Sequence, residues 1–217
     1  LFRSDEVETT ALRSIDLQIE EGEFVAIMGP SGCGKSTLLN TLGMIDRPTS
    51  GRYLFRDQEV TDLPEAALAR MRRDNLGFVF QSFNLIDELT IAENVELGLV
   101  YRRWAGKDRR ARVEAALDRV GVAHRARHYP HQLSGGQQQR AAIARAIVGQ
   151  PSLILADEPT GNLDSENGEQ VMEILKSLNR EGATIVMVTH SPAHADIAKR
   201  VVNMLDGRII VSARRAA

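Results

Sequence analysis

The stretch Phe24–Ser36 constrains the fold more than any other part of the sequence. Five apolar residues, Phe24–Met28, are followed at once by a glycine-rich turn and then by a helical pattern over Lys35–Leu42. A continuous apolar run of this length is typical of a strand that a parallel sheet buries on both faces. The order strand, turn, helix therefore predicts an α/β fold with this strand inside a parallel sheet.

The glycine-rich turn also predicts a binding site for phosphate groups, because it matches the pattern G-x-x-x-x-G-K-[ST] at every fixed position. Backbone amides of such a turn and the positive end of the following helix face the same anion. Lys35 would bring its charge to the β- and γ-phosphates of a nucleotide, and the Ser36 hydroxyl would bind Mg²⁺. We expect nucleotide contacts from Gly29, Pro30, Ser31, Gly32, Cys33, Gly34, Lys35, Ser36 and Thr37.

A second apolar strand, Leu153–Ala156, ends in the two acids Asp157 and Glu158. Ligands of open α/β sheets bind at the carboxyl ends of the strands, so this strand would bring Asp157 beside the phosphate-binding turn. Asp157 would hold Mg²⁺ directly or through water. Glu158 would accept a proton from, or orient, the water that attacks the γ-phosphate. Alone, the two acids would equally suit a solvated strand end, and the phosphate-binding turn favours the catalytic interpretation.

Periodicity divides the chain into a sheet-forming core and a helical insertion. Strand patterns occur at residues 12–19 (a hairpin), 51–55, 76–80, 184–188, 201–205 and 208–211. Helical patterns occur at residues 64–75, 91–103, 107–120, 137–148 and 169–179. We predict one domain over residues 1–217, in which 1–81 and 151–217 form a β subdomain and a parallel-sheet core, and 82–150 form a helical subdomain.

Composition excludes several classes of function. The formal net charge of -2 gives no electrostatic reason to expect direct binding of nucleic acid. No apolar run approaches the roughly 20 residues that cross a bilayer, and the N-terminus lacks the pattern of a signal peptide. A single cysteine, Cys33, excludes an internal disulfide. A membrane role would therefore be exercised through partners.

Leu133-Ser134-Gly135-Gly136-Gln137 forms a second glycine-containing helix start. Ser134 and the two glycines precede the helical pattern at 137–148, which makes a second place where a helix can bind an anion. The five residues stand 20 positions before Leu153. In residue types and in position they resemble the signature motif of ATP-binding cassette proteins.

The resemblance covers essentially the whole chain. It implies a P-loop NTPase (RecA-like) α/β fold, with a parallel-sheet core, an N-terminal antiparallel β subdomain and an inserted α-helical signature subdomain. It also implies hydrolysis of ATP to ADP and phosphate by a head-to-tail dimer of two copies of this chain. The γ-phosphate held by one subunit would be contacted by the signature of the other, namely Ser134, Gly135, Gly136 and Gln137.

The resemblance assigns roles to further residues. Gln81 matches the Q-loop glutamine, which contacts Mg²⁺ or the attacking water, and His190 matches the switch histidine, which contacts the γ-phosphate. Gly161–Asp164 matches the D-loop, which crosses the dimer interface. Phe2 is the candidate for the ring that stacks on adenine, although the strand that precedes this ring in the family has no counterpart here. The implied catalytic residues are Glu158, His190, Gln81 and Lys35, and the implied Mg²⁺ ligands are Ser36, Gln81 and Asp157.

Three segments look like the ATPases of the MacB/LolD group: Gln81–Ile86, Gln137–Arg140 and Pro159–Asp164. These ATPases serve macrolide export, lipoprotein release or peptide-antibiotic resistance, and their permeases often transmit force rather than pass substrate through a channel. The resemblance implies an ABC transporter subunit bound, through integral membrane permease subunits, to the cytoplasmic face of a bacterial inner (plasma) membrane.

The permease would dock on the insertion near Ser82–Trp104. Four apolar residues there are equally compatible with an ordinary subdomain core: Phe83, Leu85, Ile86 and Leu89. The alternative function is that of a cassette ATPase in DNA repair or macromolecular assembly. Such proteins usually carry long coiled coils or zinc sites, whereas this sequence has neither sustained heptads nor cysteine pairs.

Overall fold

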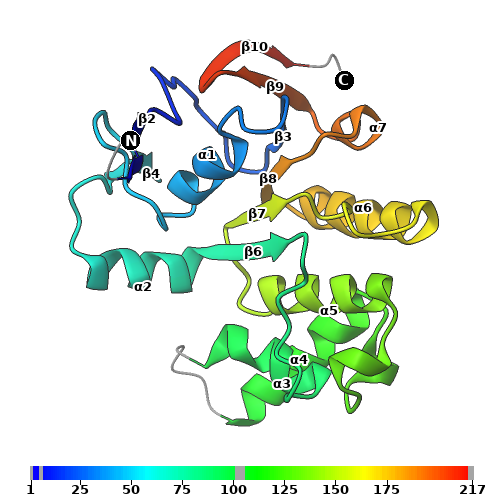
Figure 1. Cartoon of the computed structure of the whole chain (residues 1–217). Helices are drawn as coiled ribbons and strands as arrows, with labels where there is room; N and C mark the ends of the chain where they lie inside the picture. Colours follow the sequence, from blue (N-terminus) through cyan, green and yellow to red (C-terminus); the bar gives the residue numbers. More distant parts are fainter. Residues whose placement is uncertain (1, 5–6, 101–105, 215–217) are drawn as a thin grey trace.

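The computed structural model describes residues 2–4, 7–100 and 106–214, and the side chains of residues 10–100 and 106–210. Its centre is a six-stranded sheet in the order β10-β9-β3-β8-β7-β6 (Figure 1). The strands are β3 (Phe24–Met28), β6 (Leu76–Phe80), β7 (Leu153–Asp157), β8 (Thr184–Val188), β9 (Arg200–Leu205) and β10 (Arg208–Arg214). Only β10 runs antiparallel to its neighbour, which confirms the predicted parallel core.

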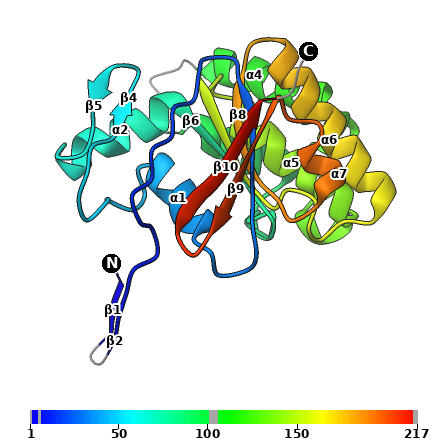
Figure 2. The same ribbon diagram turned by 90° about the horizontal axis from the view of Figure 1, so that it is seen from above.

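Both faces of this sheet are buried, as the apolar runs predict. Phe24 and Ala26 of β3 belong to one apolar cluster, and Val25 and Ile27 belong to the other. Helix α1 (Lys35–Leu42) and helix α2 (Glu65–Asn75) cover the Val25 face, while α6 (Ser165–Arg180) and α7 (Pro192–Ala195) cover the Phe24 face (Figure 2). Because successive side chains of each strand point to opposite faces of the sheet, an apolar core forms on each face.

The insertion is helical, as expected, and packs on the Phe24 face beside β6. It contains α3 (Ile91–Glu96), α4 (Gly106–Arg119) and α5 (Gly135–Ile147), with short 3-10 turns at Leu97–Leu99, Ala123–Arg125 and Pro130–Gln132. The buried Asn94 fixes the loop before α3, because its amide donates to the carbonyls of Ile86, Leu89 and Thr90.

The prediction of a hairpin at residues 12–19 is wrong. No strand is assigned there, and the apolar residues of the segment instead pack, half-buried, against the core on the α1 face: Leu12, Ile15, Leu17 and Ile19. The antiparallel pairs near the N-terminal part are β1 (Phe2–Ser4) with β2 (Val7–Thr9), and β4 (Leu54–Phe55) with β5 (Gln58–Glu59). Figure 2 shows the β1–β2 pair extending away from the sheet.

The helix expected over residues 91–103 is shorter than predicted. It ends at Glu96, and a 3-10 turn follows where Gly98 lies against α5. A Cβ at Gly98 would lie 2.6 Å from the carbonyl oxygen of Arg145, so the glycine lets the backbone of this turn lie against α5. Trp104, the predicted end of the docking segment, lies outside the described residues.

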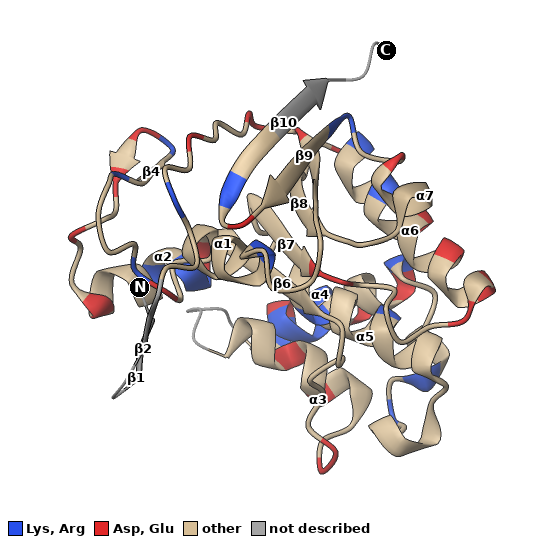
Figure 3. Cartoon of the chain, turned by 45° about the horizontal axis from the view of Figure 1, so that its top comes forward, with Lys and Arg blue, Asp and Glu red and all other residues tan. Residues whose placement is uncertain are grey.

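No helix within the described ranges is long and apolar enough to cross a membrane. Basic and acidic residues occur side by side on α2, α4 and α6 (Figure 3), in keeping with the small net charge.

Candidate functional site

Four parallel strands bring the predicted site residues to one edge of the sheet. The register pairs Phe80 with Asp157, Asp157 with Val188, and Val188 with Ile27. The glycine-rich turn, Gln81, Glu158 and His190 all follow directly on these paired ends. The sheet therefore gathers them as the sequence predicts.

The phosphate-binding turn presents an open helix start. Gly34 is the N-cap of α1 in a left-handed conformation (φ 100°), and no side chain caps the helix. The first amides of α1 are thus left for an anion. Lys35 Nζ donates to the carbonyl oxygens of Gly29 and Pro30, each at 2.9 Å, so its charge lies inside the turn.

The glycine-rich turn is held by the connection between β9 and β10 and by residues 11–13. Gly207 N donates to Cys33 O at 3.0 Å, and Arg13 N donates to Gly207 O at 2.7 Å. A Cβ at Gly34 would lie 2.5 Å from the carbonyl oxygen of Ala11, so only glycine fits. Nothing in the sequence indicated that Gly207 supports the site.

The residues expected to hold Mg²⁺ include two whose oxygens face each other. Ser36 Oγ donates to Asp157 Oδ1 at 3.5 Å. Burial raises the pKa of Asp157, and the charge of Glu158 adds to this, against the effects of Ser36 and Lys35. A hydroxyl and a carboxylate are donors that Mg²⁺ accepts when phosphates supply further oxygens. Within the described ranges, no group of three or more His, Cys, Asp or Glu side chains forms a metal site without a nucleotide.

Glu158 and His190 form a hydrogen-bonded pair, with 2.8 Å between Oε2 and Nδ1. Only 17% of the Glu158 side chain is exposed, against 72% of the His190 side chain. Glu158 adopts a left-handed backbone (φ 47°), which is rare outside glycine. Its amide donates to Val188 O at 3.0 Å. Tertiary contacts thus hold the backbone of Glu158 in a strained conformation at the edge of the sheet.

Gln81 is held by the loop that follows Glu158. Its Nε2 donates to Asn162 Oδ1 at 3.0 Å, and Asn162 Nδ2 returns a bond to Gln81 O at 3.1 Å. A Cβ at Gly161 would lie 2.7 Å from Gln81 Nε2, so the glycine makes room for the glutamine. The sequence placed Asn162 in the D-loop, but gave no signal that it pairs with Gln81.

The signature residues form a capped helix start on the other side of the sheet. Ser134 Oγ accepts from Gln137 N at 3.3 Å, and Gln137 Oε1 accepts from Ser134 N at 3.2 Å. The buried Gly136 packs on Asn167, where a Cβ would lie 1.9 Å from Oδ1. Asp164 caps α6 by accepting from Asn167 N at 2.9 Å. The signature and the D-loop are therefore packed together.

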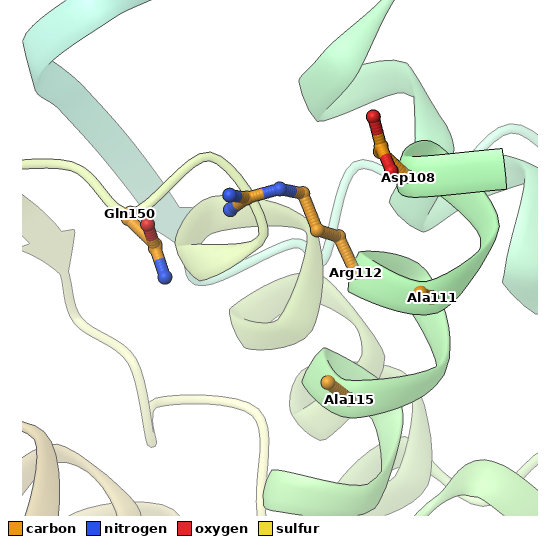
Figure 4. Close-up of a pocket in the computed structure, with 5 residues that line it drawn as sticks. All are labelled: Asp108, Ala111, Arg112, Ala115 and Gln150. Carbon is orange, nitrogen blue, oxygen red and sulfur yellow. The ribbon is translucent and has the colours of Figure 1, made fainter. Parts of the chain in front are cut away.

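The side chain of Phe2, expected to stack on adenine, is outside the described side chains. A hollow lies on the insertion and shares no residue with the phosphate-binding turn (Figure 4). It is lined by Asp108, Ala111, Arg112 and Ala115 of α4 and by Gln150.

Comparison with known proteins identifies the family. The family model described as ABC transporter matches residues 12–161. An uncharacterized ABC transporter ATP-binding protein of Methanocaldococcus jannaschii is 50% identical over 97% of this chain and 94% of its own length. The chain belongs to the ABC transporter family.

Two further ABC proteins extend the comparison. The macrolide export ATP-binding/permease protein MacB of Azoarcus sp. is 50% identical over 96% of this chain, which spans only 32% of that relative. The ATP-binding cassette MJ0796, solved as a dimer in a post-hydrolysis state with ADP and Pi, is 46% identical with a TM-score of 0.91. That match covers 100% of this chain and 96% of the cassette.

The predicted family, fold and reaction are confirmed. This ABC protein is an ATPase that converts ATP and water into ADP and phosphate, and it is an ATP-binding subunit of a transporter. The roles of its individual residues remain predictions.

Proposed function

We propose that two copies of this chain enclose two ATP molecules and drive a separate permease of the MacB/LolD type. The observation that carries the proposal is the presence, in one chain, of two glycine-containing helix starts that suit an anion. The α1 start belongs to a helix on the Val25 face of the sheet, whereas the α5 start belongs to a helix on the Phe24 face. A head-to-tail partner would give each ATP one start of each kind, and the related cassette MJ0796 was solved as a dimer.

In this arrangement Lys35 and the amides of α1 bind the phosphates, and Ser134 of the partner chain approaches the γ-phosphate. Both would stabilise the negative charge that develops on the transferred group. Lys35 would exchange its carbonyl contacts with Gly29 and Pro30 for phosphate oxygens. The positive charge stays in the turn in both states.

Glu158 would act as the general base. The water oxygen bonds to the γ-phosphorus as the bond to the bridging oxygen breaks, and that electron pair leaves on ADP. The proton of the water passes to Glu158 Oε2, which His190 holds at 2.8 Å. Gln81 would orient the water after its Nε2 has given up the hydrogen bond to Asn162 Oδ1.

Ser36, Asp157 and Gln81 would hold Mg²⁺. When bound, the ion supplies charge neutralisation to the β- and γ-phosphate oxygens. The raised pKa of Asp157 fits this role, because a buried carboxylate close to Glu158 gains from a nearby cation.

The permease would meet the insertion near Ser82–Leu89 and keep the ATPase at the cytoplasmic face of a membrane. Ile86 is 43% exposed, while Phe83, Leu85 and Leu89 are half-buried, so the apolar residues divide between surface and core. Relatives named macrolide export ATP-binding/permease protein MacB support an export task, whereas lipoprotein release or force transmission rests on the resemblance of the sequence alone. No observation favours the alternative of a DNA-repair or assembly ATPase.

The dimer is tested with Glu158→Gln, which keeps the size of the side chain and removes the base. We expect ATP binding without turnover, and an ATP- and Mg²⁺-dependent dimer in size-exclusion chromatography with light scattering. The double variant Glu158→Gln with Lys35→Met is the control and should stay monomeric. A Glu158→Gln protein that remains monomeric with saturating ATP and Mg²⁺ contradicts the proposal.

A further inference from the structure

Gln139 is a buried amide in the middle of α5 that bonds to the catalytic edge of the sheet. Its side chain has no exposed surface. Nε2 donates to Phe80 O at 3.2 Å and to Pro159 O at 2.5 Å. No group in the described part of the chain donates to its Oε1. The side chain therefore acts here through its two N–H donors.

The two carbonyls that Gln139 contacts stand next to the predicted catalytic residues. Phe80 directly precedes Gln81, and Pro159 directly follows Glu158. A displacement of α5 thus acts on both segments through one side chain. Gln138 contrasts with it, because its amide donates to Leu133 O, next to the start of its own helix.

Gln139 also shares a rigid element with the signature residues. It lies five residues after Ser134, which corresponds to about 7.5 Å along the axis of an α-helix. The reciprocal Ser134–Gln137 capping bonds tie Ser134 to the first turn of this helix. A force applied at Ser134 therefore moves the helix and Gln139 together.

We propose that Gln139 is a positioning residue that couples the two ATP sites of the dimer. Contact of Ser134 with the ATP of the partner chain moves α5, and the Gln139 amide passes that movement to Gln81 and Glu158, which act on the ATP of this chain. The inference rests on the proposed dimer. It names a physical connection, made of one helix and two hydrogen bonds, between two sites that face different nucleotides.

The test is Gln139→Met, which preserves the volume and removes both donors. Rates of phosphate release are measured over a range of ATP concentrations, and ATP affinity is measured with a fluorescent analogue. We expect kcat to fall about tenfold or more, because small displacements of reacting groups carry penalties of this order. The Hill coefficient should fall towards one while the affinity for ATP stays unchanged. A merely structural defect would instead lower the amount of binding-competent protein.

Gln170→Met is the matched control, since it makes the same change at an exposed amide on α6 that contacts Arg140. It should keep wild-type kcat and cooperativity. Gln139→Asn serves as a second variant if the methionine protein does not fold, because the shorter amide cannot reach both carbonyls. Wild-type kcat and Hill coefficient in either folded Gln139 variant overturn the coupling.

Glu158→Gln separates the two levels of the proposal. Combined with Gln139→Met it should still dimerise with ATP, because Gln139 itself touches no nucleotide. A dimer in that background together with an unchanged Gln139→Met enzyme overturns the coupling alone. A Glu158→Gln protein that never dimerises overturns the ATP sandwich and the coupling with it.

Discussion

The two helix starts that are predicted to bind an anion, at α1 and at α5, are capped differently. At α1 the N-cap is Gly34, and no side chain satisfies the first amides. At α5 the N-cap is Ser134, whose hydroxyl accepts from Gln137 N while Gln137 returns the bond. Neighbouring backbone holds the first start, whereas the second has a side-chain cap of its own.

The difference in capping predicts which helix start contributes more to the affinity for ATP. An uncapped helix with a lysine inside its turn offers several donors and a full charge to an anion. A capped helix keeps one of its amides occupied and offers the remaining ones. We therefore expect α1 to dominate binding of ATP, and α5 to contribute when the γ-phosphate is in place.

The largest expected effect comes from removing the charge at α1. Lys35→Met should weaken nucleotide binding and lower kcat by roughly 10²–10³-fold, the usual cost of losing a donor aimed at developing charge. Phosphate release and titration with a fluorescent ATP analogue measure both quantities. Lys176→Met, on the surface of α6 and paired with Glu173, is the control. Wild-type turnover in Lys35→Met would mean that α1 is not the dominant site.

An intermediate effect is expected at α5, where capping and anion contact are separable. Ser134→Asp keeps the N-cap, because aspartate caps as well as serine, but places a negative charge at the predicted γ-phosphate contact. We expect wild-type thermal stability and a loss of ATPase activity of about tenfold or more.

Ser134→Ala is the complementary variant. It removes the cap and should lower the free energy of unfolding by about 1 kcal/mol, with a smaller loss of activity than the aspartate variant. Full activity in Ser134→Asp would show that the α5 start does not face phosphate, and would leave it only a structural role.

The smallest expected effect is on the free energy of unfolding, which we expect a substitution of Asp157 to increase. Burial and Glu158 raise the pKa of Asp157, so its ionised form is disfavoured in the folded chain. Asp157→Asn should therefore stabilise the nucleotide-free protein near neutral pH. The gain should decline as the pH falls through the folded-state pKa, and should vanish below the ordinary value of 3.8. Urea unfolding at several pH values measures it; a destabilised Asn variant near neutral pH contradicts the prediction.

Local patterns predicted most of the secondary structure, and they failed where contacts between distant segments decide. The helix expected from Glu169 begins at Ser165, because Asp164 caps it through Asn167. Alternating apolar residues at 12–19 predicted strands, yet they pack half-buried against the core and form no strand. Alternation reports burial of one side of a segment, and it does not report a hydrogen-bonded partner.

By itself, the sequence determined the parallel strands of the core and most of the helices, and it marked the glycine-rich turn, the two acids and the signature as candidates, because each is a short run of adjacent residues. Only the tertiary structure decided what supports them: Gly207 beneath Cys33, Asn162 against Gln81, and Gln139 between Phe80 and Pro159. These contacts join residues that are tens to more than a hundred positions apart in the chain. Their partners are backbone carbonyls or side-chain amides that any sequence contains, so only the folded geometry selects them.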